Sequence, residues 1–102
     1  MARLTWTDEA LRDVRDIHNW IARDSLRLAD RITDDIFDKV QDLNRFPEIG
    51  APVEDEGFEG LRELLVEKFR IIYLYKSDSC RIVCVTRGSR DLKRLLDPEN
   101  LP

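Results

Sequence analysis

The hydrophobic residues change their spacing once along the chain, and this change limits the possible folds. In residues 8–23, Ala10, Val14, Ile17 and Ile21 recur three or four positions apart, as on one face of a helix. Residues 61–86 instead form short runs rich in β-branched and aromatic side chains, which is typical of strands. A chain of 102 residues has room for one domain, so helices and strands must share one core.

Cap and turn residues divide the first half into a strand and two helices. Residues 3–6 form a short β-prone run, and Thr7 precedes a helix predicted over 8–23 as its N-cap. Asp24 and Ser25 indicate the turn of a helical hairpin, and the second helix is predicted over 26–45. Residues 47–60 contain prolines, glycines and an acidic run, and they predict a long loop.

The second half is predicted to be a meander of three strands over 61–66, 69–76 and 80–86, followed by a short terminal helix around 92–96. Short connections between strands favour antiparallel pairing. The predicted fold class is therefore α+β in the order β-α-α-β-β-β-(α). The helical hairpin packs on one face of an antiparallel sheet, and the other face is left for solvent or a ligand.

Alternation within residues 69–76 assigns the two faces of the central strand. Phe69, Ile71, Tyr73 and Tyr75 share the face with the greater apolar area, which is therefore the core face. Arg70 lies on the opposite face and is predicted to point away from the helices.

Charge is distributed unevenly around a formal net charge of −4. Residues 1–60 carry 8 Lys/Arg and 15 Asp/Glu, whereas residues 61–102 carry 9 Lys/Arg and 6 Asp/Glu. An acidic first half and a basic second half predict a surface with two poles.

The longest apolar run is residues 71–75, and the N-terminus lacks the apolar core of a secretory signal, so we expect a cytoplasmic protein without a membrane partner.

The cysteines and the single histidine give no sign of a metal site or a disulfide. Cys80 and Cys84 are four residues apart, which in a strand separates them by about 13 Å, too far for a bond. We expect two reduced core residues, no metal and no cofactor.

Several short motifs, taken in order, resemble the RelE/ParE toxin superfamily. They are residues 4–7 with Glu9, Ala10 and Asp13; residues 43–50; residues 61–64 and 69–73; and residues 85–92. The resemblance covers about residues 3–96. It implies a toxin of a type II toxin–antitoxin module, as used in plasmid stabilisation. A cognate antitoxin, such as a ParD-like DNA-binding protein, would hold the toxin inactive in a hetero-oligomer.

The superfamily contains mRNA endoribonucleases that act on the ribosome (RelE-like) and poisons of DNA gyrase (ParE-like). Cleavage needs a general base, and Arg70, Arg87 and Arg90 offer only cations for phosphate. RelE-like members carry a Tyr or His near the C-terminus, where this chain has residues 92–96 without either. His18 lies on the first predicted helix, and we interpret it as a structural residue.

Other candidate bases are Tyr73 and Tyr75, which are predicted to face the core, and Glu63 and Glu67, which could simply border the sheet. The residues after Arg87 fit the ParE-like branch, although that branch often has histidine at this position. We therefore expect a growth-arresting toxin that binds DNA gyrase and is not an enzyme. The alternatives are a metal-independent, ribosome-dependent endoribonuclease, or a non-toxic relative that only binds its antitoxin.

The predicted target-binding residues are Arg70, Arg87, Arg90, Lys93 and Arg94, the first three of which would serve as catalytic candidates in a nuclease. The predicted antitoxin-binding residues, at the edges of the hairpin's apolar stripe, are Trp20 and Leu28.

Overall fold

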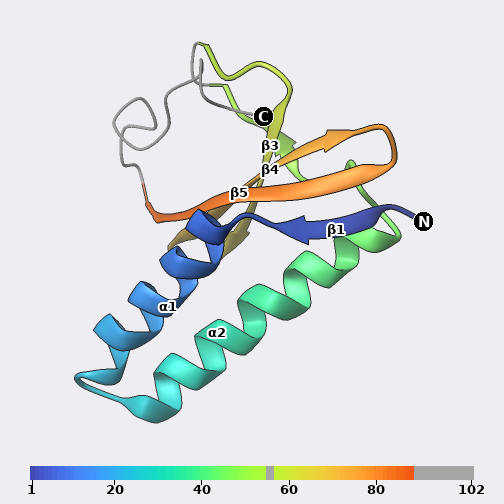
Figure 1. The fold of residues 1–102 in the computed structure, drawn as a ribbon. Helices are drawn as coiled ribbons and strands as arrows, with labels where there is room; N and C mark the ends of the chain where they lie inside the picture. The colour runs from blue at the N-terminus through green and yellow to red at the C-terminus, as the bar shows by residue number, and fades with distance from the viewer. Residues whose placement is uncertain (55–56, 89–102) are drawn as a thin grey trace.

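The computed structural model describes residues 1–54 and 57–88, and within them it confirms the predicted α+β fold (Figure 1). The predicted terminal helix around 92–96 lies outside the described residues. The elements follow the predicted order, except that the segment predicted as a loop contains a short additional strand, β2. They are β1 (Arg3–Trp6), α1 (Asp8–Ala22), α2 (Leu26–Gln41), the 3₁₀ turn η1 (Asp42–Asn44), β2 (Ala51–Pro52), β3 (Leu61–Val66), β4 (Phe69–Lys76) and β5 (Ser79–Arg87).

Both helices of the hairpin begin at the predicted caps. The Thr7 hydroxyl accepts a hydrogen bond from the Ala10 N–H, and the Ser25 hydroxyl accepts one from the Leu28 N–H. Each bond satisfies a backbone donor that the first helical turn leaves unpaired. The second helix is shorter than predicted, because α2 ends at Gln41 and the chain continues as the tighter turn η1.

The sheet has five strands in the order β1-β5-β4-β3-β2. β2, β3, β4 and β5 pair antiparallel, as the short connections predicted, but β1 joins the far side of β5 in parallel. Parallel pairing needs a long crossover connection, and the hairpin between β1 and the meander supplies it.

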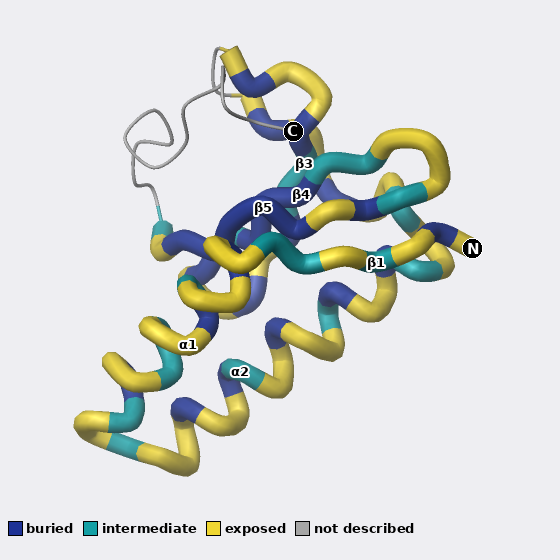
Figure 2. The backbone as a smooth tube through the Cα atoms, viewed as in Figure 1, coloured by how far each residue is buried: buried dark blue, intermediate teal, exposed yellow. Residues whose placement is uncertain are grey.

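The main core lies between the hairpin and one face of the sheet. Ile36 and Val40 of α2 pack with Ile71 and Tyr73 of β4, which confirms the predicted core face. The Trp6 ring on β1 meets the Phe37 ring on α2 at a centroid distance of 4.9 Å. Burial in Figure 2 follows the inner face of each helix and the central strands.

Within residues 1–54 and 57–88, no helix combines the length and apolar character needed to cross a membrane.

The opposite face of the sheet is not left open as predicted. Val53 and Phe58, from the connection between β2 and β3, pack on Ile72 and Cys84 in a second apolar cluster. That connection lies on the side of the sheet away from the hairpin (Figure 1). Phe58 is 1% exposed, so this loop is a structural cover over part of the face.

Candidate functional site

Arg70 points away from the hairpin, as predicted, but it is not available as a separate cation. Its Nε donates a 3.0 Å hydrogen bond to Glu63 Oε2, and its Nη2 contacts the same oxygen in an ion pair. The two side chains are 13% and 22% exposed, so the pair is largely shielded from water. Glu63, a candidate base in the sequence, is thus the counter-ion of Arg70, which has a structural role at this point of the sheet.

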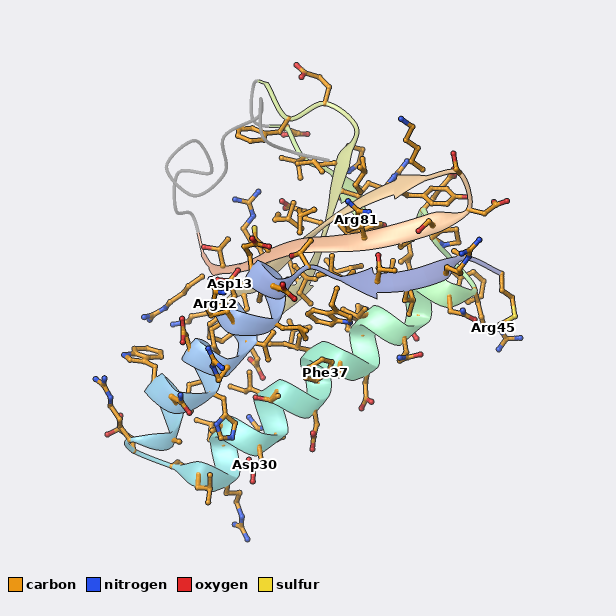
Figure 3. The ribbon with its side chains drawn as sticks, viewed as in Figure 1. Arg12, Asp13, Asp30, Phe37, Arg45 and Arg81 are labelled. Atoms are coloured by element: carbon orange, nitrogen blue, oxygen red, sulfur yellow. The ribbon has the colours of Figure 1, made fainter. Side chains whose placement is uncertain are left out.

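The start of α1 closes the edge of β5 beyond the end of β1. The Thr7 hydroxyl donates to the carbonyls of Ile82 and Val83, and Asp13 Oδ2 accepts a 3.0 Å bond from the Val85 N–H. Asp13 lies beside the end of β5 in Figure 3. β1 pairs only as far as Ile82, so these side chains replace the missing strand for the next residues of β5.

Cys84 is a buried residue of β5 that lies near Arg70 of the Arg70–Glu63 pair. Burial, together with the nearby Asp13 carboxylate and against a smaller opposing effect of Arg70, raises the pKa of the Cys84 thiol to about 12. Burial also raises the pKa of the Cys80 thiol. Both cysteines are unpaired and buried, which confirms the predicted pair of reduced core residues and leaves neither suited to thiolate chemistry.

The stability of the chain should therefore fall as pH rises above about 9. The unfolded Cys84 thiol releases its proton near the ordinary value of 9.0, whereas the folded thiol keeps its proton up to about 12. Between these values the unfolded state binds fewer protons, so the free energy of unfolding decreases with pH. Urea titrations from pH 7 to 11 should show this decrease, and Cys84→Ala should reduce its slope. An unchanged slope would exclude Cys84 as its cause.

Arg87 and Trp20, which the sequence assigned to two different surfaces, lie together. The Arg87 guanidinium carbon is 4.7 Å from the centre of the Trp20 ring, within the range of a cation–π contact. The predicted exposure of both hairpin residues is confirmed, since Trp20 is 48% and Leu28 is 36% exposed. The stack connects the end of β5 to the hairpin.

Two hollows meet at this stack. The first, which we call the hairpin groove, has a volume of about 310 Å³. It lies between α1, α2, the β3–β4 turn and the end of β5. Its lining consists of Trp20, Ile21, Leu28, Arg31, Ile32, Glu67, Lys68, Phe69 and Arg87.

The second hollow, which we call the sheet-end hollow, has a volume of about 450 Å³. It brings together Arg70 and Arg87, two of the predicted target-binding residues. Its lining consists of Leu65, Glu67, Lys68, Arg70, Arg87 and Gly88. Leu65 is 62% exposed, so the hollow combines a basic rim with an exposed apolar side chain.

The other candidates are dispersed or lie outside the structure. Arg90, Lys93 and Arg94 fall outside the described residues. His18 bonds to Asp30 across the hairpin at 2.8 Å, and it lines neither hollow. In residues 1–54 and 57–88, no group of three His, Cys, Asp or Glu side chains is placed to hold a metal ion.

The sequence interpretation missed Arg31 and Lys68, and it considered Glu67 only as a possible base or a border of the sheet. Arg31 stands on α2 next to the apolar stripe residue Ile32, which was the available signal. Lys68 and Glu67 form the β3–β4 turn, where Glu67 has a left-handed φ of 53°. Charged residues are common in a solvent-exposed turn. The sequence therefore did not show that this turn lies against the helical hairpin and lines the groove.

Solved structures with the same architecture come from RelE/ParE-type toxins. The chromosomal ParDE system of P. aeruginosa gives a TM-score of 0.74 at 25% identity, over 87% of this chain and 98% of that one. The toxin–antitoxin complex RelBE2 of Mycobacterium tuberculosis gives 0.64 at 21% identity, over 84% and 96%. The isolated E. coli RelE toxin gives 0.63 at 15% identity, over 94% and 100%. The fold is therefore that of the RelE/ParE superfamily.

Comparison with models of protein families then shows to which family within this superfamily the chain belongs. The family described as "ParE toxin of type II toxin-antitoxin system, parDE" matches residues 4–92. The chain belongs to this family of ParE toxins. Comparison with curated protein sequences gave no match.

Proposed function

We propose that this toxin arrests growth by binding DNA gyrase in the cytoplasm, and that a cognate antitoxin neutralises it. The family match over residues 4–92 supports the toxin assignment. The likeness to the ParDE system supports an antitoxin partner, since that similarity extends over 98% of the matched chain. The contacts would come from the basic end of the sheet, where Arg87, Lys68 and the sheet-end hollow lie.

The structural roles of two candidate bases, Tyr73 and Glu63, support target binding over catalysis. The Tyr73 hydroxyl donates to the Pro47 carbonyl at 2.8 Å and accepts from the Gly50 N–H at 3.0 Å. Burial raises the pKa of the Tyr73 hydroxyl, which makes it a poorer source of a phenolate. Glu63 is held by Arg70. Tyr73 and Glu63 are thus engaged in holding the fold, whereas Glu67, the other acidic candidate, is 55% exposed and lines the sheet-end hollow.

A second function, ribosome-dependent mRNA cleavage, has one observation in its favour. The sheet-end hollow is lined by Lys68 and Arg87 together with Arg70, which is paired with Glu63, and cationic side chains around one hollow suit a phosphate. Arg90, Lys93 and Arg94, which lie outside the described residues, are further proposed contacts in either function.

A supercoiling assay with purified gyrase tests the proposal directly. The wild-type chain should inhibit supercoiling, and Arg87→Ala should raise the half-inhibiting concentration by about tenfold, because a charge-assisted contact is lost. Arg81→Ala, on an exposed position of the same strand, is the matched control. Cleavage sites in mRNA by primer extension, without gyrase inhibition, would replace gyrase by the ribosome as the target. Neither signal, with retained antitoxin binding, would identify a non-toxic relative.

The antitoxin surface makes a separate prediction. Trp20→Ala should weaken the antitoxin complex by tenfold or more, because large exposed aromatic residues in a groove commonly dominate binding. The melting temperature should change little, since Trp20 is 48% exposed. Calorimetric titration and thermal unfolding measure the two effects. Unchanged affinity, or loss of the fold, would contradict this role for Trp20.

A further inference from the structure

Residues 45–49, which we call the apolar turn, follow η1 and present large apolar side chains to solvent. Leu43 before the turn and Gly50 after it are buried. Phe46 and Ile49 between them are 59% and 50% exposed. The core therefore explains the two ends of this segment, but it does not explain two neighbouring apolar side chains in water.

The backbone of the apolar turn is held in one conformation from below. The Tyr73 hydroxyl donates to the Pro47 carbonyl at 2.8 Å and accepts from the Gly50 N–H at 3.0 Å. Arg62 Nη1 donates to the carbonyls of Glu48 at 3.1 Å and Gly50 at 2.7 Å. A partner that covers the exposed side chains would therefore not have to order the turn first, which lowers the entropic cost of binding.

The side chains of the apolar turn also carry one charge of each sign. They line a hollow of about 570 Å³, formed by Arg45, Phe46, Pro47, Glu48 and Ile49. In the part of the chain that the structure describes, neither Arg45 nor Glu48 forms an ion pair. Such a surface is complementary to a second copy of itself, because a two-fold axis brings the Arg45 of each copy toward the Glu48 of the other.

The neighbouring outer surface of the hairpin is unsuited to a second copy. Asp30, Asp34, Asp38 and Asp42 recur along α2 and η1, and all four are exposed. Two such surfaces would repel each other, whereas two apolar turns would not, because their charges balance.

The apolar turn lies at the opposite end of the sheet from the sheet-end hollow. Arg87 is at one end of β5 and Ser79 at the other. β1 begins opposite Ser79, and the adjacent Ala2 bonds through its N–H to the carbonyl of Asn44, the last residue of η1. Figure 3 shows Arg45 at this end. Two copies joined here would leave both sheet-end hollows accessible.

We propose that two copies of this chain associate through their apolar turns, with Phe46 of each copy in the hollow of the other and Arg45 of each paired with Glu48 of the other. The toxin then carries two target-binding ends, one at each far end of the dimer. The patch is small beside a standard interface, so the dissociation constant should be about 10 μM. This inference goes beyond the proposed function, since it requires neither gyrase nor an antitoxin.

Sedimentation equilibrium of the purified chain measures the association. The wild-type chain should be largely monomeric at about 1 μM and largely dimeric at about 200 μM. Phe46→Ser should raise the dissociation constant by about tenfold or more, because it removes the apolar side chain that fills the hollow. Leu26→Ser is the matched control, since Leu26 is 61% exposed at the other end of α2, and it should leave the association unchanged.

Charge reversal tests the reciprocal pairing. Arg45→Glu and Glu48→Arg should each be largely monomeric at about 200 μM, because each variant places like charges opposite each other. An equimolar mixture of the two should recover dimers, since an acidic turn then meets a basic one. If Phe46→Ser fails to fold by circular dichroism, these variants decide, because both altered side chains are exposed.

Three results would overturn the proposal. They are a wild-type chain that remains monomeric at about 200 μM, unchanged association in folded Phe46→Ser, and a mixture of the two charge variants that stays monomeric. A monomeric wild-type chain whose binding to gyrase or to the antitoxin is weakened by Phe46→Ser would assign the apolar turn to that protein instead.

Discussion

Replacing Gly50 by alanine should lower the free energy of unfolding by about 3 kcal/mol, because the added methyl group has no space. A Cβ at this position would lie 2.6 Å from Tyr73 Cε1, 2.7 Å from its hydroxyl and 2.8 Å from the Glu63 carbonyl oxygen. Moving Tyr73 away would also break its hydrogen bond with the Gly50 N–H. Urea unfolding followed by circular dichroism measures the loss.

Gly60→Ala is the matched control, because alanine at this position would strain the backbone without a steric clash. Gly60 has a φ of +93°, and no atom lies within 4 Å of a Cβ built there. That substitution should cost only about 1–2 kcal/mol, the usual penalty of a left-handed backbone for an L-residue. Equal losses in the two variants would show that close packing around Gly50 is not the reason for its glycine.

Arg70→Ala should lower the free energy of unfolding by about 3 kcal/mol, whereas an ordinary surface substitution changes it by only about 0.5 kcal/mol. The difference comes from Glu63, whose carboxylate would remain largely buried without its hydrogen-bonded cation. Loss of toxicity in this variant would therefore not by itself identify Arg70 as a contact. Chemical unfolding must accompany every growth assay of Arg70.

Removing both charges separates the structural role from a binding role. The double variant Glu63→Gln with Arg70→Met should recover most of the lost stability, because neither side chain then leaves a buried charge unpaired. If this stable variant still arrests growth, Arg70 serves only the fold. If the single and double variants are equally unstable, the ion pair is not the source of the loss.

The parts of the fold that depend on local sequence were predictable. The hairpin follows from apolar residues at helical spacing, and its two helices begin at Thr7 and Ser25 because their hydroxyls satisfy the first backbone donors. The alternation in residues 69–76 assigned Tyr73 to the core and Arg70 to the other face, and both positions are confirmed.

The parts that depend on pairing between distant elements were not predictable. Glu63 and Glu67 were both conceivable internal partners of Arg70 from the sequence. The choice of Glu63 requires the register of β3 against β4, which places Glu63 opposite Ile72, two residues along β4 from Arg70. The cover formed by Phe58 depends on the path of a connection whose composition suggested only a loop.

The candidate site likewise combines features that depend on local sequence with features that depend on contacts between distant residues. The exposure of Trp20 could be predicted from its place at the edge of the helical stripe, but its stack on Arg87 joins residues 67 positions apart. Arg31, Lys68 and Glu67 are ordinary surface charges in the sequence. They become part of a site only because the sheet brings the β3–β4 turn against the hairpin.

The parallel pairing of β1 with β5 also affects when the toxin can form during synthesis. Arg3 lies opposite Ser79 and Trp6 opposite Ile82, so β1 pairs with a strand that is synthesised much later, the last one of the meander. The chain must close a loop of more than 70 residues before the sheet is complete, which favours slow folding. Arg87 reaches the Trp20 ring only at that stage. The groove therefore remains unfinished until β5 has been synthesised, and the assembled surface appears only after β5 pairs with β1.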